Sequence, residues 1–79
     1  MNIAETGLDI RKRRREIEIT QEALADAAGV STPFLIGLEK GGNENPGMGK
    51  VIDVIAALEK FEAERISHEN RSDQNHSTV

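Results

Sequence analysis

The chain has 79 residues, enough for one domain with a single modest core. It contains no cysteine, which excludes disulfide scaffolds, thiolate zinc sites and cysteine nucleophiles. Ten lysines and arginines against fourteen aspartates and glutamates give a net charge of −4, which is the wrong sign for a general polyanion binder.

A first helix is predicted from about residue 5 or 6 to Glu18, with Ile10 and Ile17 seven residues apart on its apolar face. Residues 11–15 read Arg-Lys-Arg-Arg-Arg, so five positions hold half of all the lysines and arginines. A compact basic patch can bind phosphates even on an acidic protein, because salt screens charges that lie more than about 8 Å away. A solvated helix face, or ion pairs with neighbouring acids, explains the same run, and both interpretations remain open.

A short second helix is predicted from Gln21 to Ala28. Thr20 before it is a suitable N-cap, because a threonine hydroxyl accepts a hydrogen bond from a free amide of the first turn. Gly29 after it is expected to end the helix, since glycine readily adopts a positive φ. The predicted buried face carries Leu24, Ala25 and Ala28.

A third helix is predicted from Pro33 to about Lys40. Proline disfavours the helical conformation at the residue before it and suits the first helical position, so Thr32 is the expected N-cap. Gly41 is expected to end this helix, with Leu35 and Leu38 on its buried edge.

The last predicted helix follows a glycine-rich loop and carries two apolar stripes. A first stripe has spacings of three and four and consists of Met48, Val51, Ile52, Ile55 and Leu58. Val54 and Phe61 form the second. Because two stripes exceed what so small a core covers, we predict a dimer interface that includes Val54, Leu58 and Phe61. The alternative is one wide core-facing stripe with Phe61 folded back, and the pattern leaves open whether the helix reaches Ser67 or bends after Leu58.

Residues 68–79 contain one aliphatic side chain among many polar ones, which predicts a disordered tail after a folded domain at 1–67. The histidines, His68 and His76, lie in this segment and form a poor zinc site without a cysteine. Glu62 and Glu64 face different sides of a helix, so they cannot act as an acid–base pair. We therefore expect no metal, no cofactor, no catalytic residue and no enzymatic activity.

The strongest motif runs from Thr20 to Ser31 and reads Thr-Gln-Glu-Ala-Leu-Ala-Asp-Ala-Ala-Gly-Val-Ser. It joins a capped helix, a glycine turn and a second capped helix, as a helix-turn-helix requires. Together with Arg14-Arg15-Glu16 and Leu35-x-x-Leu38-Glu39-x-Gly41, this motif resembles the Cro/XRE family of phage-repressor-like DNA-binding proteins. The later part, from Phe34 to Leu58, is similar to the HipB-like antitoxin branch. The resemblance implies an all-α, compact, lambda-repressor-like domain of four to five helices, to which the disordered tail is attached.

The resemblance also implies roles for single residues. Arg14 on the first helix is expected to pair with Glu39 at the end of the third. Gln21 matches a residue that anchors a phosphate, and Arg13 is the first-helix cation that best matches a contact to the DNA backbone. Positions 32, 33, 36 and 37 correspond to the outward face of the recognition helix. The predicted DNA-contacting residues are Arg13, Gln21, Thr32, Pro33, Ile36, Gly37, Lys40 and Asn43.

The function that this resemblance implies is a sequence-specific transcriptional regulator, expected to be a dimeric repressor that inserts helix 33–40 into the major groove of an operator in double-stranded DNA. The outward side chains offer few hydrogen bonds to bases, which favours an alternative. In that alternative the chain is a protein-binding module, an antitoxin or antiactivator, that masks a toxin or transcription factor through apolar helix surfaces. The apolar stretches are too short to span a bilayer and no signal-peptide pattern is present, so we expect a cytoplasmic protein without a membrane partner.

Overall fold

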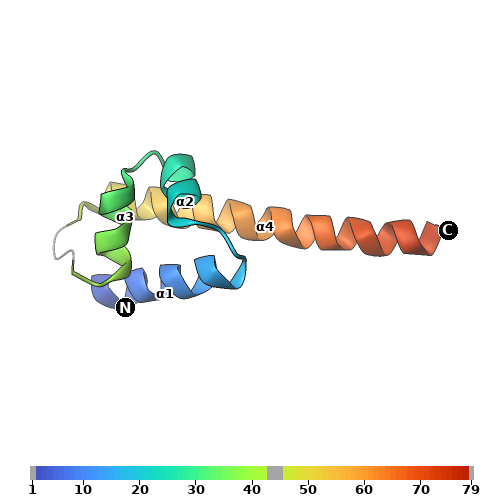
Figure 1. Ribbon diagram of the computed structural model, residues 1–79, viewed down its shortest axis with the longest axis horizontal. Helices are drawn as coiled ribbons and strands as arrows, with labels where there is room; N and C mark the ends of the chain where they lie inside the picture. Colours follow the sequence, from blue (N-terminus) through green and yellow to red (C-terminus); the bar gives the residue numbers. More distant parts are fainter. Residues whose placement is uncertain (1, 43–45, 79) are drawn as a thin grey trace.

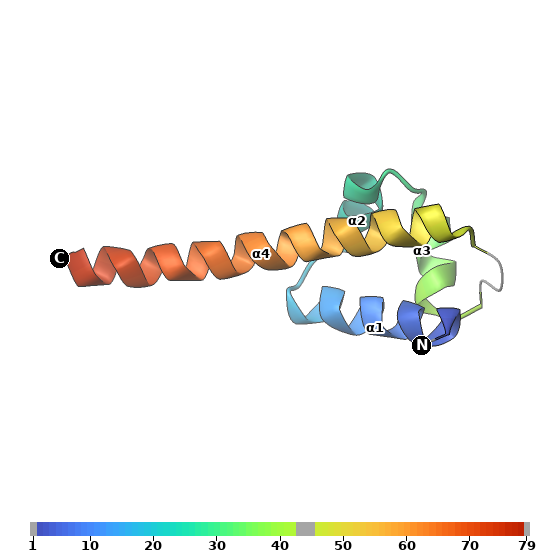
Figure 2. The ribbon, with the colours of Figure 1, turned by 180° about the vertical axis from the view of Figure 1, so that it is seen from behind.

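The computed structural model describes residues 2–42 and 46–78, with side chains described as far as Ile66. The described residues form four helices and no strand, which confirms the predicted all-α fold. The helices are α1 (Ile3–Glu16), α2 (Gln21–Ala28), α3 (Thr32–Glu39) and α4 (Met48–Thr78). In Figures 1 and 2, α1 and α4 run in the same general direction, and the two short helices α2 and α3 cross them.

Helix α1 begins and ends about two residues earlier than predicted. Asn2 is its N-cap, since the side-chain Oδ1 accepts a hydrogen bond of 2.8 Å from the amide of Glu5. The helix stops at Glu16, and Glu18 then adopts the left-handed conformation with φ of 58°. A non-glycine residue in this region marks a tight reversal of the chain, which here leads into α2.

Helix α2 has the predicted bounds and both predicted caps. The Oγ1 of Thr20 accepts a hydrogen bond of 3.0 Å from the amide of Ala23. Gly29 ends the helix with φ of 72°, and the amide of Val30 returns to the carbonyl oxygen of Ala25 at 3.0 Å. This left-handed glycine turn aims the chain from α2 into α3.

Helix α3 begins one residue before the predicted start, so the prediction of Thr32 as its N-cap and of a helix over 33–40 is wrong. Ser31 is the N-cap, because its Oγ accepts a hydrogen bond of 3.2 Å from the amide of Phe34. Pro33 lies in the first turn, where a missing amide hydrogen costs nothing. The restriction that proline places on the preceding residue is a preference, and the capping hydrogen bond of Ser31 outweighs it.

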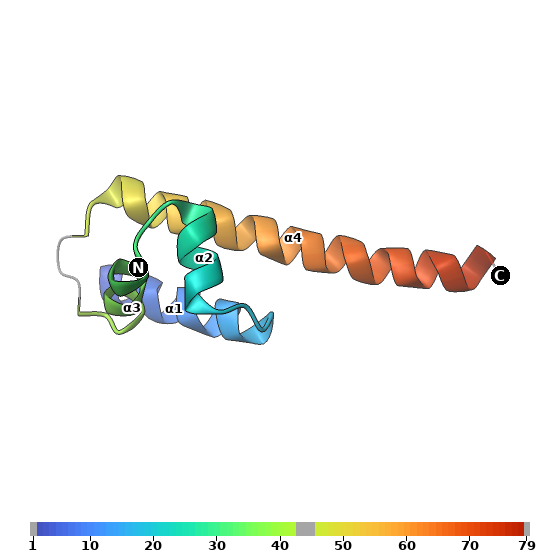
Figure 3. The same cartoon turned by 45° about the horizontal axis from the view of Figure 1, so that its top comes forward.

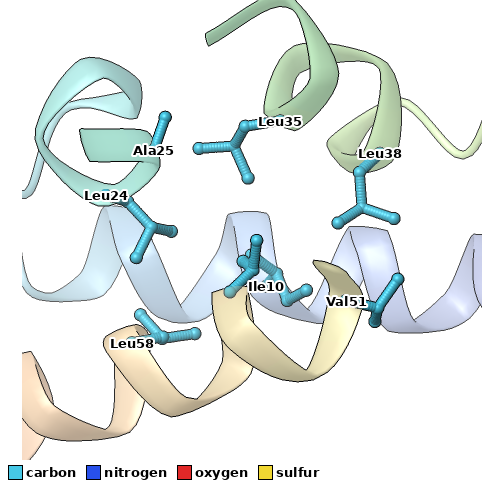
Figure 4. Packing of buried hydrophobic residues seen from close by; sticks show 8 residues of the cluster. Ile10, Leu24, Ala25, Leu35, Leu38, Val51 and Leu58 are labelled. Carbon is cyan, nitrogen blue, oxygen red and sulfur yellow. The ribbon is translucent and has the colours of Figure 1, made fainter. Parts of the chain in front are cut away.

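All four helices contribute to one core. Figure 4 shows how the side chains of α1, α2 and α3 meet those of α4. The buried hydrophobic residues are Ile10, Leu24, Ala25, Leu35, Leu38, Val51, Val54 and Leu58. Ile10, Leu24, Leu35 and Leu38 were predicted on the core faces of their helices, so these predictions are confirmed.

Helix α4 corrects the assignment of its two stripes. Val54 and Leu58 are wholly buried within the single chain, so they cannot contact a second subunit, and their predicted place in a dimer interface is wrong. Phe61 is half-buried. Met48 and Ile52, which belong to the first predicted stripe, are 60% and 56% exposed. Spacings of three and four mark apolar positions on a helix, but the packing of α2 against α4 decides which of them face inward.

Helix α4 continues past Leu58 without a break and extends beyond the other three helices, as Figures 1 and 3 show. Its backbone is helical to Thr78. The side chains after Ile66 lie outside the described part of the structure. The predicted disordered tail at 68–79 consists of residues whose side chains are not described, and it stays a prediction.

One close approach was not anticipated from the sequence. Gly7 is buried where α1 crosses α3, and a Cβ atom added to it would overlap the carbonyl oxygen of Leu38. Gly7 therefore permits the backbones of the two helices to touch, and this contact sets the position of α3 against α1.

Candidate functional site

A buried ion pair fixes α1 to the end of α3. The Nε and Nη2 atoms of Arg14 donate hydrogen bonds of 2.7 and 2.9 Å to the two carboxylate oxygens of Glu39. The remaining Nη1 donates to the carbonyl oxygen of Ile19 at 2.8 Å, so the guanidinium also holds the turn before α2. Glu39 is 1% exposed and Arg14 is 9% exposed. Such a bidentate pair restrains both the distance and the orientation of the two helices.

Gln21 is attached to the same ion pair. Its Nε2 donates a hydrogen bond of 3.1 Å to the Oε1 of Glu39, which orients the side chain at the first residue of α2. The amide oxygen of Gln21 and the free backbone amides of this helix end remain beside it, and helix N-termini favour anions. Glu39 therefore links three elements: α1 through Arg14, the start of α2 through Gln21, and α3 through its own backbone.

These elements enclose an open groove of about 440 Å³. Its lining comes from one face of α1, from the start of α2 and from the outer side of α3. The lining residues are Arg11, Arg14, Arg15, Thr20, Gln21, Glu22, Ile36, Glu39 and Lys40. Predicted site residues of α2 and α3 thus share one surface with cations of α1.

Five of the predicted contact residues belong to α3 and its C-cap, and Ile36 and Lys40 are the two of them that line the groove. Pro33 and Lys40 are exposed, and Thr32, Ile36 and Gly37 are partly exposed. None of these five residues belongs to the hydrophobic core of the described chain. Asn43, the remaining predicted contact, lies outside the described residues.

Arg13 does not lie at this groove. Its Nη2 and Nε donate hydrogen bonds of 2.6 and 3.0 Å to the carboxylate of Glu62 on α4, and its Nη1 lies 3.4 Å from Asp9. The hydrogen bonds from Arg13 hold the pKa of the Glu62 carboxyl below its ordinary value of 4.5. Arg13 therefore connects α1 to α4, so the structure gives no support to its predicted role as the DNA-backbone contact of the first helix.

Arg11 and Arg15 are the exposed cations of α1 that border the groove, and the sequence did not predict them as DNA contacts. Both are exposed, and within the described part of the chain neither takes part in an ion pair. Helix geometry can identify them, because successive residues are rotated by about 100° around the helix axis and residues four apart therefore lie on the same side. With Arg14 pointing at Glu39, positions 11 and 15 flank the groove side of α1, and position 13 turns toward α4.

Lys40 is the third exposed cation that lines this groove, and it is the C-cap residue of α3. It likewise has no ion-pair partner among the described residues. Glu22 is the acid at the rim, and the carboxylate of Glu39 is occupied by Arg14 and Gln21. The groove is therefore positively charged although the chain as a whole has a net charge of −4.

Comparison with known proteins identifies the pattern. A family model described as helix-turn-helix (HTH_3) matches residues 10–60, which is more than half of the chain and includes α2, the glycine turn and α3. No curated protein and no solved structure shows significant similarity to the chain. Across residues 2–42 and 46–78, none of the helices combines the length and apolar character needed to cross a membrane.

Proposed function

The chain belongs to the Cro/C1-type helix-turn-helix family of DNA-binding regulators, and from this premise we propose that it is a dimeric transcriptional repressor. Each subunit inserts α3 into the major groove of an operator with two-fold symmetry. The two recognition helices of a dimer enter successive major grooves about 34 Å apart. Occupation of a promoter in this way blocks transcription sterically.

The observation that carries the proposal is the groove between α1, α2 and α3. Arg11 and Arg15 of α1 and Lys40 at the end of α3 all line this groove, so it presents three exposed cations to the phosphates of a bound duplex. Gln21 lines the same groove, and its hydrogen bond to Glu39 holds its side chain in place. Phosphate contacts set the register of a protein on DNA, and a preoriented side chain loses less conformational freedom on binding.

Sequence selectivity in this proposal comes from few direct contacts. Thr32 can donate to a base or phosphate because Ser31, and not Thr32, supplies the capping hydroxyl. Ile36 can contact the methyl group of thymine, whereas Pro33 and Gly37 offer no side-chain hydrogen bond. The shape and deformability of the operator therefore supply much of the discrimination, with Asn43 proposed near the sugar–phosphate backbone.

Arginine-to-alanine substitutions on α1 test whether DNA binding depends on the side of this helix that borders the groove or on the side that faces α4. We expect Arg11→Ala and Arg15→Ala each to weaken binding to duplex DNA by about tenfold. In a plot of the logarithm of the affinity against the logarithm of the salt concentration, each lost contact is expected to make the slope less negative by about one. Arg13→Ala is the matched control, because it removes the same charge from the same helix but from the side that faces Glu62. Its affinity is expected to stay within about threefold of the parent chain. Fluorescence anisotropy with the promoter of the chain's own operon, at two salt concentrations, measures all three.

An equal loss of DNA affinity in the three variants would contradict this assignment, because it would mean that affinity depends on the total charge of the chain and not on the groove. Circular dichroism of each variant checks that the fold is retained.

A second function is favoured by the apolar outward side of α3. Pro33, Ile36 and Gly37 would suit a protein surface, as in an antitoxin or antiactivator of the HipB-like kind that masks a toxin or transcription factor. Ile36→Asp would damage either function. Arg11→Ala and Arg15→Ala would spare a partner that docks on apolar surface, so a stoichiometric complex that survives both substitutions, with no binding to DNA, would favour this second function.

A further inference from the structure

A second groove lies on the other side of α2, where its last turn meets α4. Its volume is about 260 Å³, and it is lined by Ala27 of α2 and by Ala57, Lys60, Phe61 and Glu64 of α4. The four α4 residues are spaced three, one and three apart, so they form one face of the helix. This face is distinct from the groove of Arg11, Arg15 and Lys40.

The chemistry of this groove is apolar at the bottom and charged at the rim. The methyl groups of Ala27 and Ala57 leave room beside the half-buried ring of Phe61. Lys60 and Glu64 are exposed, and neither takes part in an ion pair in the described residues. Small side chains next to a large aromatic one form a hole and a knob on the same surface.

We propose that a second copy of the chain occupies this groove, with the two α4 helices antiparallel across a two-fold axis near residues 60 and 61. A two-fold interface must be complementary to itself, and this face contains both halves of each contact. The aromatic ring of Phe61 fits the space above Ala57 of the other copy. Lys60 of each copy meets Glu64 of the other.

The spacing along α4 permits both contacts at once. When Lys60 lies opposite Phe61 of the second copy, Glu64 of that copy is three residues away, which is about 4.5 Å along the helix axis. A lysine side chain spans this distance. Ala57 of the second copy is three residues from its Lys60, so Phe61 reaches it from the opposite position. In a second copy the same four side chains supply the complementary groups at the required spacing, whereas an unrelated partner would need a separate set of matching residues.

This interface replaces the predicted one at Val54 and Leu58, whose side chains lie in the core, and retains Phe61. It supplies the dimer contact of the proposed repressor. Its test measures association of the chain without DNA, so failure of the interface and failure of the DNA-binding proposal are distinguished by separate measurements.

A charge exchange on the rim tests the proposal. Lys60→Glu places two acids on each copy, and Glu64→Lys places two lysines on each copy, so each variant alone would face like charges across the axis. We expect each to dimerise at least about tenfold more weakly than the parent chain in analytical ultracentrifugation. In a one-to-one mixture of the two variants, opposite charges would again face each other at both rim contacts. The introduced acid of one copy would meet the introduced lysine of the other, and the unchanged Glu64 would meet the unchanged Lys60, so a heterodimer is expected.

Both substitutions lie at exposed positions, and circular dichroism confirms folding of each variant before mixing. Restored dimers in the mixture would support the interface, since misfolded chains would not regain association on mixing. Three results would overturn it: a parent chain that sediments as a monomer at its highest soluble concentration, variants that dimerise like the parent, or a mixture that stays monomeric.

Discussion

Replacement of Arg14 by methionine is expected to lower the free energy of unfolding by about 3–5 kcal/mol, because it leaves the carboxylate of Glu39 buried without its cation. Glu39 is 1% exposed and receives two hydrogen bonds from Arg14, and Gln21 alone cannot compensate its charge. The loss also frees the carbonyl oxygen of Ile19 before α2. For a domain of this size, such a loss is a large part of the total stability. Urea denaturation followed by circular dichroism measures it.

The double variant Arg14→Met/Glu39→Leu is the control. Removing both charges leaves no buried ion, so most of the lost stability is expected to return. A single variant that loses less than about 1 kcal/mol, or a double variant as unstable as the single one, would mean that the pair is not buried as described. Since Gln21 and α3 depend on the same pair, the single variant is also expected to lose DNA binding.

Replacement of Gly7 by alanine is expected to lower the free energy of unfolding by about 3 kcal/mol, although alanine favours helices by about 1 kcal/mol over glycine. The added Cβ would overlap the carbonyl oxygen of Leu38, and a backbone atom cannot rotate away as a side chain can. Helices α1 and α3 would have to separate, which also stretches the pair between Arg14 and Glu39. Thermal and urea unfolding of the variant measure the effect.

Gly49→Ala is the matched control for this prediction. Gly49 lies in the first turn of α4, and a Cβ added to it would meet nothing within 4 Å. Its substitution is expected to leave stability unchanged or to raise it by up to about 1 kcal/mol. If Gly7→Ala behaved in the same way, the close crossing of α1 and α3 would be refuted.

Features that depend on neighbouring residues in the chain could be predicted from the sequence. The bounds of α2 follow from Thr20, which caps its start, and from Gly29, which takes the left-handed conformation at its end. Each of these contacts spans only a few residues, so the local pattern contains all the information that it requires. The all-α fold and the helix-turn-helix match follow from the same local signals.

Features that depend on the rotation of a helix could not be predicted in the same way. Arg13 and Arg15 are equally basic in the sequence, yet one faces Glu62 and the other faces the groove. The deciding contact is between Arg14 and Glu39, twenty-five residues apart. For the same reason the two stripes of α4 do not show which residues face the core: with α2 packed onto α4, Val54 of the second stripe is buried and Ile52 of the first is exposed.

The acidic composition of the chain constrains how it can bind DNA. A net charge of −4 repels a polyanion at long range, but beyond about 8 Å this repulsion is screened at physiological salt. Within that distance Arg11, Arg15 and Lys40 dominate at the groove. We therefore expect weak non-specific binding and a strong dependence on dimerisation, because each subunit alone makes few phosphate contacts.

The salt dependence of binding between the full chain and duplex DNA from the promoter of its own operon tests the central claim most directly. If a dimer neutralises about six phosphates, the logarithm of the affinity is predicted to fall with the logarithm of the salt concentration at a slope near −5. A chain that fails to bind this DNA at low salt, or that binds it with a slope near zero, would contradict the account.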